Sequence, residues 1–129
     1  MPETNVTRIP APGEEGAGLS SDVSIVGDML VTTQIPDLPD GSIELGDIRA
    51  QSIQILSNLK TSLERNGSSL EEVAHLTIYL TDIEERHVFN EVYREYFGFP
   101  YPVRCAVGTP ALAIEGMKVE VTALAAKRK

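Results

Sequence analysis

The chain has 129 residues, 42% of them hydrophobic and 23% charged, which is ordinary for one soluble globular domain. Its 19 acidic and 11 basic residues give a net charge of −8, and its apolar runs fall far short of the ~20 residues of a membrane span, so neither a nucleic-acid nor a membrane partner is expected. A single cysteine excludes an internal disulfide and a cysteine-rich zinc site, and it favours a reducing, cytoplasmic compartment.

Residues 1–20 are rich in proline and glycine and hold few large apolar side chains. This composition predicts an irregular N-terminal arm, followed by a single domain over residues 21–129. Residues 24–35 contain two short apolar runs on either side of Gly27 and Asp28, a pair that favours a two-residue β-hairpin turn. The prolines and the glycine that follow are expected to end the second strand.

Two helices are expected after this hairpin. Asp47 is a suitable N-cap for the first helix, whose apolar residues recur every three or four positions up to Asn66 and Gly67, a pair typical of a helix end. The second helix is expected over residues 84–97, and Gly98 ends it. Its apolar and aromatic stripe is interpreted as core packing, because an amphipathic helix buries such a stripe.

Three further runs are typical of β-strands, over residues 75–80, 103–107 and 117–125. The order of strands, helix, strand, helix and strands predicts an α+β fold with a single mixed β-sheet and two helices packed on one face. The other face of the sheet also carries apolar residues. Another copy of the chain is the simplest cover for it.

Arg104 is the first candidate for a chemical role, because it lies within an apolar β-run that follows Pro102. An arginine in such a run needs an anionic partner, since burying an unpaired guanidinium is very costly. Its planar fork fits a carboxylate with two hydrogen bonds. A bound carboxylate, a structural salt bridge and an exposed strand position are all consistent with this pattern.

The other candidates have simpler interpretations beside the chemical one. Glu120 could orient a water or move a proton, or it could be a solvated residue on the polar face of the last strand. Asn90 lies on the flank of the second helix's apolar stripe, where its amide is available for a hydrogen bond. Cys105 is more typical of a small core residue than of a nucleophile. His75 and His87 lack the close spacing of a helical metal pair, so no metal site is expected.

Several segments between about residues 27 and 126 together resemble the Rid (reactive intermediate deaminase, or YjgF) family. No single segment is specific, and the resemblance is carried by their order and spacing. The segments are Gln34-Ile35-Pro36, Gln51, Asn58-Leu59-Lys60, Gly67-Ser68-Ser69-Leu70-Glu71-Glu72-Val73, Tyr79-Leu80-Thr81-Asp82, Asn90-Glu91-Val92-Tyr93-Arg94-Glu95-Tyr96-Phe97, Pro102-Val103-Arg104 and Val119-Glu120-Val121.

The resemblance implies a chorismate-mutase-like fold and a homotrimer with clefts between its subunits. It implies a cofactor-independent enzyme that hydrolyses reactive enamines and imines, such as 2-aminoacrylate, to a 2-keto acid and ammonia. By position, Arg104 matches the family's carboxylate-binding arginine and Glu120 matches the glutamate that orients the attacking water. Asn90 matches the asparagine bordering the cleft, and Thr33 and Cys105 are expected to contact the substrate.

The chain departs from the family pattern at three places, so it resembles a divergent member of the family. The usual Gly-Pro-Tyr-Ser-Gln, whose tyrosine lines the cleft, is replaced by Gly16-Ala17-Gly18-Leu19-Ser20. Where the family usually has Thr-Ser-Gly-Gln-Ile-Pro, this chain has Thr32-Thr33-Gln34-Ile35-Pro36, which is one residue shorter and lacks the glycine. The family's cysteine two places after the arginine is replaced by Ala106. Two alternatives follow: a deaminase of a larger enamine such as 2-aminomuconate, and a non-catalytic trimer that binds a carboxylate ligand. A role in RNA cleavage or translation inhibition fits poorly with the net charge.

Overall fold

A computed structural model describes residues 3–16 and 18–129 of the chain. In this part it contains six strands, two α-helices and two short 3-10 helices. The elements are β1 (Val6–Ile9), β2 (Val23–Val26), β3 (Met29–Gln34), α1 (Ile48–Arg65), η1 (Leu70–Glu72), β4 (Val73–Leu80), η2 (Ile83–Glu85), α2 (Arg86–Tyr96), β5 (Val103–Gly108) and β6 (Val119–Ala126).

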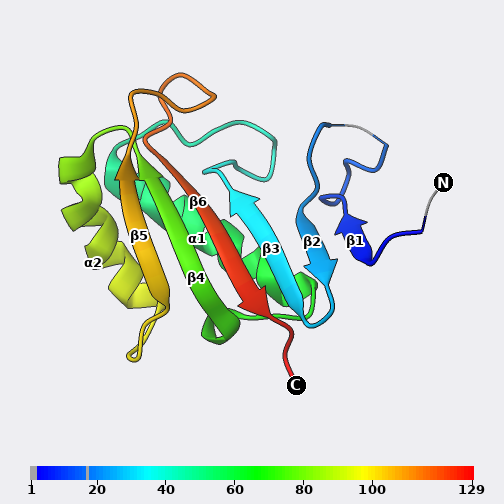
Figure 1. The fold of residues 1–129 in the computed structure, drawn as a ribbon. Coiled ribbons are helices and arrows are strands. Elements are labelled where there is room, and N and C mark those ends of the chain that lie inside the picture. The colour runs from blue at the N-terminus through cyan, green and yellow to red at the C-terminus, as the bar shows by residue number, and fades with distance from the viewer. Residues whose placement is uncertain (1–2, 17) are drawn as a thin grey trace.

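The strands form one sheet in the order β1-β2-β3-β6-β4-β5. All neighbouring pairs are antiparallel except β4 and β5, which are parallel, so the sheet is mixed. Both α-helices lie on the same face, with α2 beside β5 at one edge of the sheet and β1 at the other edge (Figure 1). The predicted α+β architecture is therefore confirmed. Among the described helices, none has the length and apolarity needed to cross a membrane.

The predicted turns and helix ends have the expected local geometry. Gly27 has a positive φ of 58° in the turn between β2 and β3, a conformation that glycine adopts readily. The Asp47 side chain accepts a hydrogen bond of 2.9 Å from the backbone N–H of Ala50 and so caps α1. Gly67, with φ of 85°, follows the last turn of α1. These signals are local, which is why the sequence predicts them well.

Two elements differ from the expectations. Strand β1 lies inside the segment predicted to be irregular, of which residues 1, 2 and 17 are outside the described part. It pairs with β2. The sequence does not predict it, because a segment of four residues is too short to show the apolar–polar alternation of a strand. The second helix begins at Arg86 rather than at residue 84, because Asp82 accepts a hydrogen bond from the N–H of Glu84 and starts the 3-10 turn η2.

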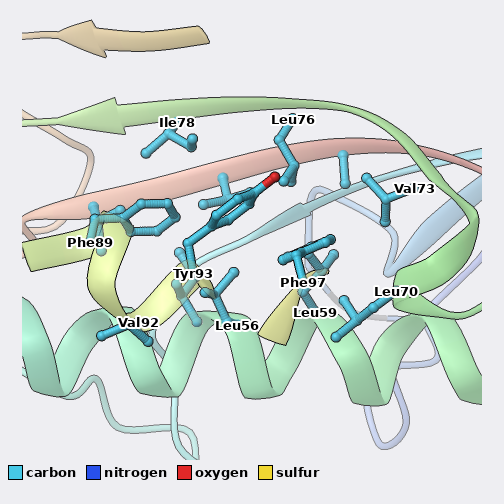
Figure 2. Packing of buried hydrophobic residues seen from close by; sticks show 14 of the residues in the cluster. Leu56, Leu59, Leu70, Val73, Leu76, Ile78, Phe89, Val92, Tyr93 and Phe97 are labelled. Carbon is cyan, nitrogen blue, oxygen red and sulfur yellow. The ribbon is translucent and has the colours of Figure 1, made fainter. Parts of the chain in front are cut away.

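The hydrophobic core lies between the two helices and the sheet (Figure 2). Helix α1 and strands β4 and β6 supply most of it, and the aromatic residues of α2 close one end. The fully buried members include Ile55, Leu56, Leu59, Leu63, Leu76, Ile78, Leu80, Phe89, Val92, Val119, Val121 and Ala123. Phe89 and Tyr93 belong to the stripe that the sequence assigns to core packing, and both are buried.

The opposite face of the sheet, here called the open face, has no helix over it (Figure 1). The large apolar side chains exposed on it range from 38% exposed for Met29 to 70% for Val103. The strand register places these residues on the same face as Val26, Val107 and Leu124. Exposing an apolar surface of this kind to water is unfavourable, so the open face is expected to be an interaction surface.

Candidate functional site

Arg104 lies on the helix face of the edge strand β5. It pairs with Leu76 of β4, whose side chain is fully buried beneath the helices, so the Arg104 side chain points to the same side. If the more apolar face of β5 were turned toward the helices, Val103 and Val107 would be buried, yet both are exposed. The arginine therefore occupies the position next to α2, where its stem can pack while its charged end reaches the surface.

Two residues of α2 fix the Arg104 guanidinium. Nη2 of Arg104 donates a hydrogen bond to Oδ1 of Asn90. Cζ of Arg104 lies 4.5 Å from the centroid of the Tyr93 ring, which is a cation–π contact. In residues 3–16 and 18–129, no carboxylate comes within the 4.0 Å of a salt bridge with Arg104. The positive charge is held in place but has no anionic partner within the described chain.

Arg104 lines a surface hollow of about 280 Å³ with Asn90, Tyr93, Arg94, Tyr101 and Pro102. Both charged side chains of this hollow are arginines. A hollow without an acidic lining in a chain of net charge −8 is suited to a small anion. Hereafter it is called the arginine hollow.

Tyr93 is the member of the arginine hollow that the sequence does not single out. It belongs to the apolar stripe of α2 and is only 4% exposed, which agrees with core packing. Its hydroxyl, however, is buried without a hydrogen-bond partner. Burial raises the pKa of Tyr93, and the neighbouring charge of Arg104 partly offsets this rise. The three-residue spacing from Asn90, which places both on one side of the helix, is the sequence signal that could have pointed to it.

Glu120 and Thr33 lie together on the open face of the sheet. Glu120 pairs with Tyr79 of β4, between residues whose side chains are buried on the helix face, so its own half-buried side chain points the other way. Thr33 shares a hydrogen bond of 2.8 Å with Thr122 of β6. Glu120 and Thr33 both line a larger hollow of about 740 Å³, which also includes Arg8 of β1.

The hollow around Glu120 is rich in hydroxyl and acidic groups. Ser20 and Ser21, which precede β2, contribute to its wall. Asp37 lines it as well, and burial raises the pKa of this carboxyl, helped by the negative charge of Glu14. The hollow can place a polar substrate and a water near the Glu120 carboxylate.

Cys105 lies apart from both hollows. Its side chain is on the open face of β5 and is exposed, so the interpretation of Cys105 as a small core residue is wrong. The cause is that Arg104, not its apolar neighbours, occupies the helix face of β5, so Cys105 lies on the open face with Val103 and Val107. Its Sγ lies 4.0 Å from Oγ1 of Thr77, a weak contact at most. Among the described residues, no group of three or more histidine, cysteine, aspartate or glutamate side chains is arranged to hold a metal ion.

A single chain thus brings the candidate residues together in two separate groups. Arg104 and Asn90 are on the helix face at the β5 edge, while Glu120 and Thr33 are on the open face of the central strands. The sheet itself lies between the two groups. A site that uses both must be formed where two chains meet.

The family model described as Endoribonuclease L-PSP matches residues 14–127, nearly the whole chain. This chain belongs to the Rid/YjgF family. A RutC family protein of Pyrococcus horikoshii is 41% identical over 100 residues, which cover 77% of this chain and 79% of that protein. Protein HMF1 of Saccharomyces cerevisiae is 37% identical, with 78% of this chain and 77% of that protein covered.

Solved structures of Rid proteins have the same fold. RidA of the Antarctic bacterium Psychrobacter sp. aligns with a TM-score of 0.80 and 29% identity, over 96% of this chain and 99% of that one. YyfA of the Rid family from Yersinia pestis aligns with a TM-score of 0.85 and 29% identity, over 94% and 98% of the two chains. Membership of the Rid/YjgF family supports a general role in imine processing, although the family description itself names an endoribonuclease.

Proposed function

We propose that this Rid/YjgF protein is a cofactor-independent deaminase that hydrolyses 2-imino acids and their enamines to 2-keto acids and ammonia. The observation that carries the proposal is the Arg104 guanidinium, which is held by Asn90 and Tyr93 and has no carboxylate partner in the described chain. A fixed, unpaired arginine at a hollow without acidic residues is suited to a substrate carboxylate.

Asn90 has a specific part in this binding. Its Oδ1 accepts from one terminal nitrogen of Arg104 and so limits rotation of the guanidinium. The remaining N–H groups of the fork are then directed to a ligand, and less conformational freedom is lost when the carboxylate binds. The proposed role of Asn90 is therefore to orient Arg104 at the border of the cleft.

The active protein in this proposal is a homotrimer. The apolar open face supplies a surface that a second copy would bury, and the separation of Arg104 from Glu120 requires two chains for a complete site. Arg104 of one chain binds the substrate carboxylate. Glu120 and Thr33 of the partner subunit border the reacting carbon.

The reaction needs little from the protein because the C=N bond is already electrophilic. Water adds its oxygen to the imine carbon while Glu120 accepts one of its protons, and Glu120 passes that proton to the nitrogen to give a neutral carbinolamine. Glu120 then takes the proton of the new hydroxyl group and delivers it to the amino group, so that the C–N bond breaks, ammonia leaves and the C=O of the 2-keto acid remains. Positioning of the carboxylate and the water supplies most of the acceleration. Thr33 contacts the substrate through its hydroxyl in this arrangement.

The test is to generate 2-aminoacrylate in situ with a dehydratase and to follow the loss of the imine and the formation of pyruvate. We expect acceleration over buffer at micromolar protein and its loss in Glu120→Gln. A rate equal to that of buffer alone would refute the deaminase proposal. A larger enamine such as 2-aminomuconate belongs in the same assay, because the hollow beside Glu120 has room for a longer side chain.

A second candidate function is the binding of a carboxylate ligand without turnover. The specific observation in its favour is that one chain contains a complete arginine hollow but keeps Glu120 on the other face of the sheet. Calorimetry with 2-oxobutanoate separates the two functions. Binding that depends on Arg104 together with background turnover supports the ligand-binding function, and turnover that depends on Glu120 refutes it.

A further inference from the structure

The buried hydroxyl of Tyr93 has no structural reason to be there. The ring packs within the aromatic row of α2 and the loop that follows, with its centroid 4.6 Å from that of Phe97 and 5.7 Å from that of Tyr101. A phenylalanine would make the same ring contacts. It would avoid the cost of burying an unpaired polar atom, about 1–3 kcal/mol for a hydroxyl in a protein.

The position of the hydroxyl relative to Arg104 indicates what could use it. The ring points from α2 toward the sheet (Figure 2). The Arg104 guanidinium lies over the ring, near enough to the phenol oxygen to lower the pKa of Tyr93 but without the geometry of a hydrogen bond to that oxygen. Tyr93 lines the same hollow as Arg104 and Asn90. An anion that draws the guanidinium toward itself therefore arrives beside a phenol that is free to donate.

We propose that Tyr93 is a ligand-binding residue of the arginine hollow, whose O–H donates to the substrate carboxylate alongside the Arg104 fork while its ring supports the guanidinium. This inference rests on the proposed function for the identity of the ligand. The carboxylate gains a third donor, and the orphaned hydroxyl gains the acceptor that the unliganded chain does not supply. Because burial raises the pKa of Tyr93, the phenol stays protonated and able to donate throughout the neutral range.

Tyr96 provides a matched control on the same helix. Its hydroxyl is already paired with Oγ of Ser57 at 2.7 Å, and Tyr96 does not line the arginine hollow. Removing one phenol oxygen at each position is the same chemical change in two environments. The two variants, Tyr93→Phe and Tyr96→Phe, should therefore have opposite consequences.

The experiment measures binding of 2-oxobutanoate by calorimetry, turnover of 2-aminoacrylate, and melting temperature for the full chain and both variants. For Tyr93→Phe we expect Kd and KM to rise roughly tenfold or more, kcat to stay within about twofold, and the melting temperature to be unchanged or higher. For Tyr96→Phe we expect unchanged Kd and a lower melting temperature. A Tyr93→Phe protein with wild-type Kd overturns the proposal.

Two further readouts separate this inference from the proposed function. Titration of the wild-type protein with 2-oxobutanoate should perturb the ultraviolet absorption of tyrosine, and the perturbation should be smaller in Tyr93→Phe, where Tyr101 is the tyrosine left in the hollow. The absence of the signal in the wild type overturns the proposal even if the variant folds poorly. If the wild type binds the keto acid through Tyr93 but never turns over an imine, the deaminase proposal fails and the inference stands.

Discussion

Arg65, at the end of helix α1, and Arg104, in strand β5, differ in what surrounds their charge. Arg65, the last residue of α1, is 2.9 Å from the carboxylate of Asp22, which precedes β2. The same carboxylate accepts hydrogen bonds from Ser62 and Asn66, at 2.5 and 2.9 Å. Asp22 is only 7% exposed at its side chain, so this cluster is nearly closed to water.

Arg104 has the opposite environment. Its partners are a neutral amide and an aromatic ring, and it opens on a hollow that holds a second arginine and no acid. The Arg65 cluster satisfies each of its charges within the chain and holds the loop before β2 against α1. Arg65, which has its counter-ion within the chain, therefore serves the folded structure, whereas Arg104, which is oriented but unpaired, is available for a ligand.

The largest expected effect is on activity at Arg104. Arg104→Ala removes two charge-assisted hydrogen bonds of ~1.5–3 kcal/mol each, so kcat/KM should fall beyond roughly a hundredfold. Arg104→Lys keeps the charge but loses the two-pronged geometry, and it should cost roughly ten- to a hundredfold. Steady-state kinetics with 2-aminoacrylate checks both, and both proteins should keep near-native melting. An unfolded alanine variant beside a normal lysine variant would instead make Arg104 a structural residue.

The matched change at Arg65 should affect stability and leave activity alone. Arg65→Ala removes the counter-ion of the nearly buried Asp22 carboxylate. Because the guanidinium is 38% exposed and partly screened by water, we expect a decrease of about 2 kcal/mol in the free energy of unfolding, below the value for a fully buried pair. Urea denaturation measures it. Unchanged stability together with reduced turnover would show that Arg65, like Arg104, serves activity rather than folding.

Asn90→Ala should weaken substrate binding, by less than the changes at Arg104. The guanidinium keeps its charge and its contact with Tyr93 but loses the acceptor that orients it. The loss of one hydrogen bond of ~0.5–1.5 kcal/mol predicts a KM about three- to tenfold higher, with a smaller change in kcat. The kinetic assay decides this, and an unchanged KM would show that Tyr93 alone is enough to hold Arg104.

The smallest effect is expected at Arg49. It forms a surface ion pair of 2.8 Å with Glu91, and the two side chains are 45% and 55% exposed. Pairs of this kind contribute little because water already solvates both charges. Arg49→Gln should change neither turnover nor the denaturation midpoint, and it serves as the control for removing a positive charge from the helical layer.

The sequence predicts those parts of the fold that depend on local signals. The turn at Gly27, the cap at Asp47 and the helix end at Gly67 all have geometries set by a few neighbouring residues. The sequence does not predict strand β1, because this strand is defined by the pairing of only four residues with another segment, β2. The sequence also leaves the orientation of β5 open, and the structure shows that Arg104 rather than Val103 faces the helices, where α2 packs beside this edge strand.

The sequence identifies the candidate residues, but it does not predict that they form two separate groups. Arg104 and Glu120 fall on opposite faces because of the order of the strands and the register of β4 with its two neighbours. The sequence assigns Tyr93 to the core, and its ring is indeed buried there. Only the absence of a partner for its hydroxyl distinguishes it, and this is a property of the packed structure.

The most direct test of the account is a mixing experiment with Arg104→Ala and Glu120→Gln chains carrying different tags. Each variant alone should be inactive, because every site lacks one of its two residues. After unfolding and joint refolding, random assembly should give intact Arg104 and Glu120 at about one quarter of the interfaces, so activity should return to about one quarter of the wild-type level. Assemblies that contain both tags but remain inactive would contradict a site formed between two chains.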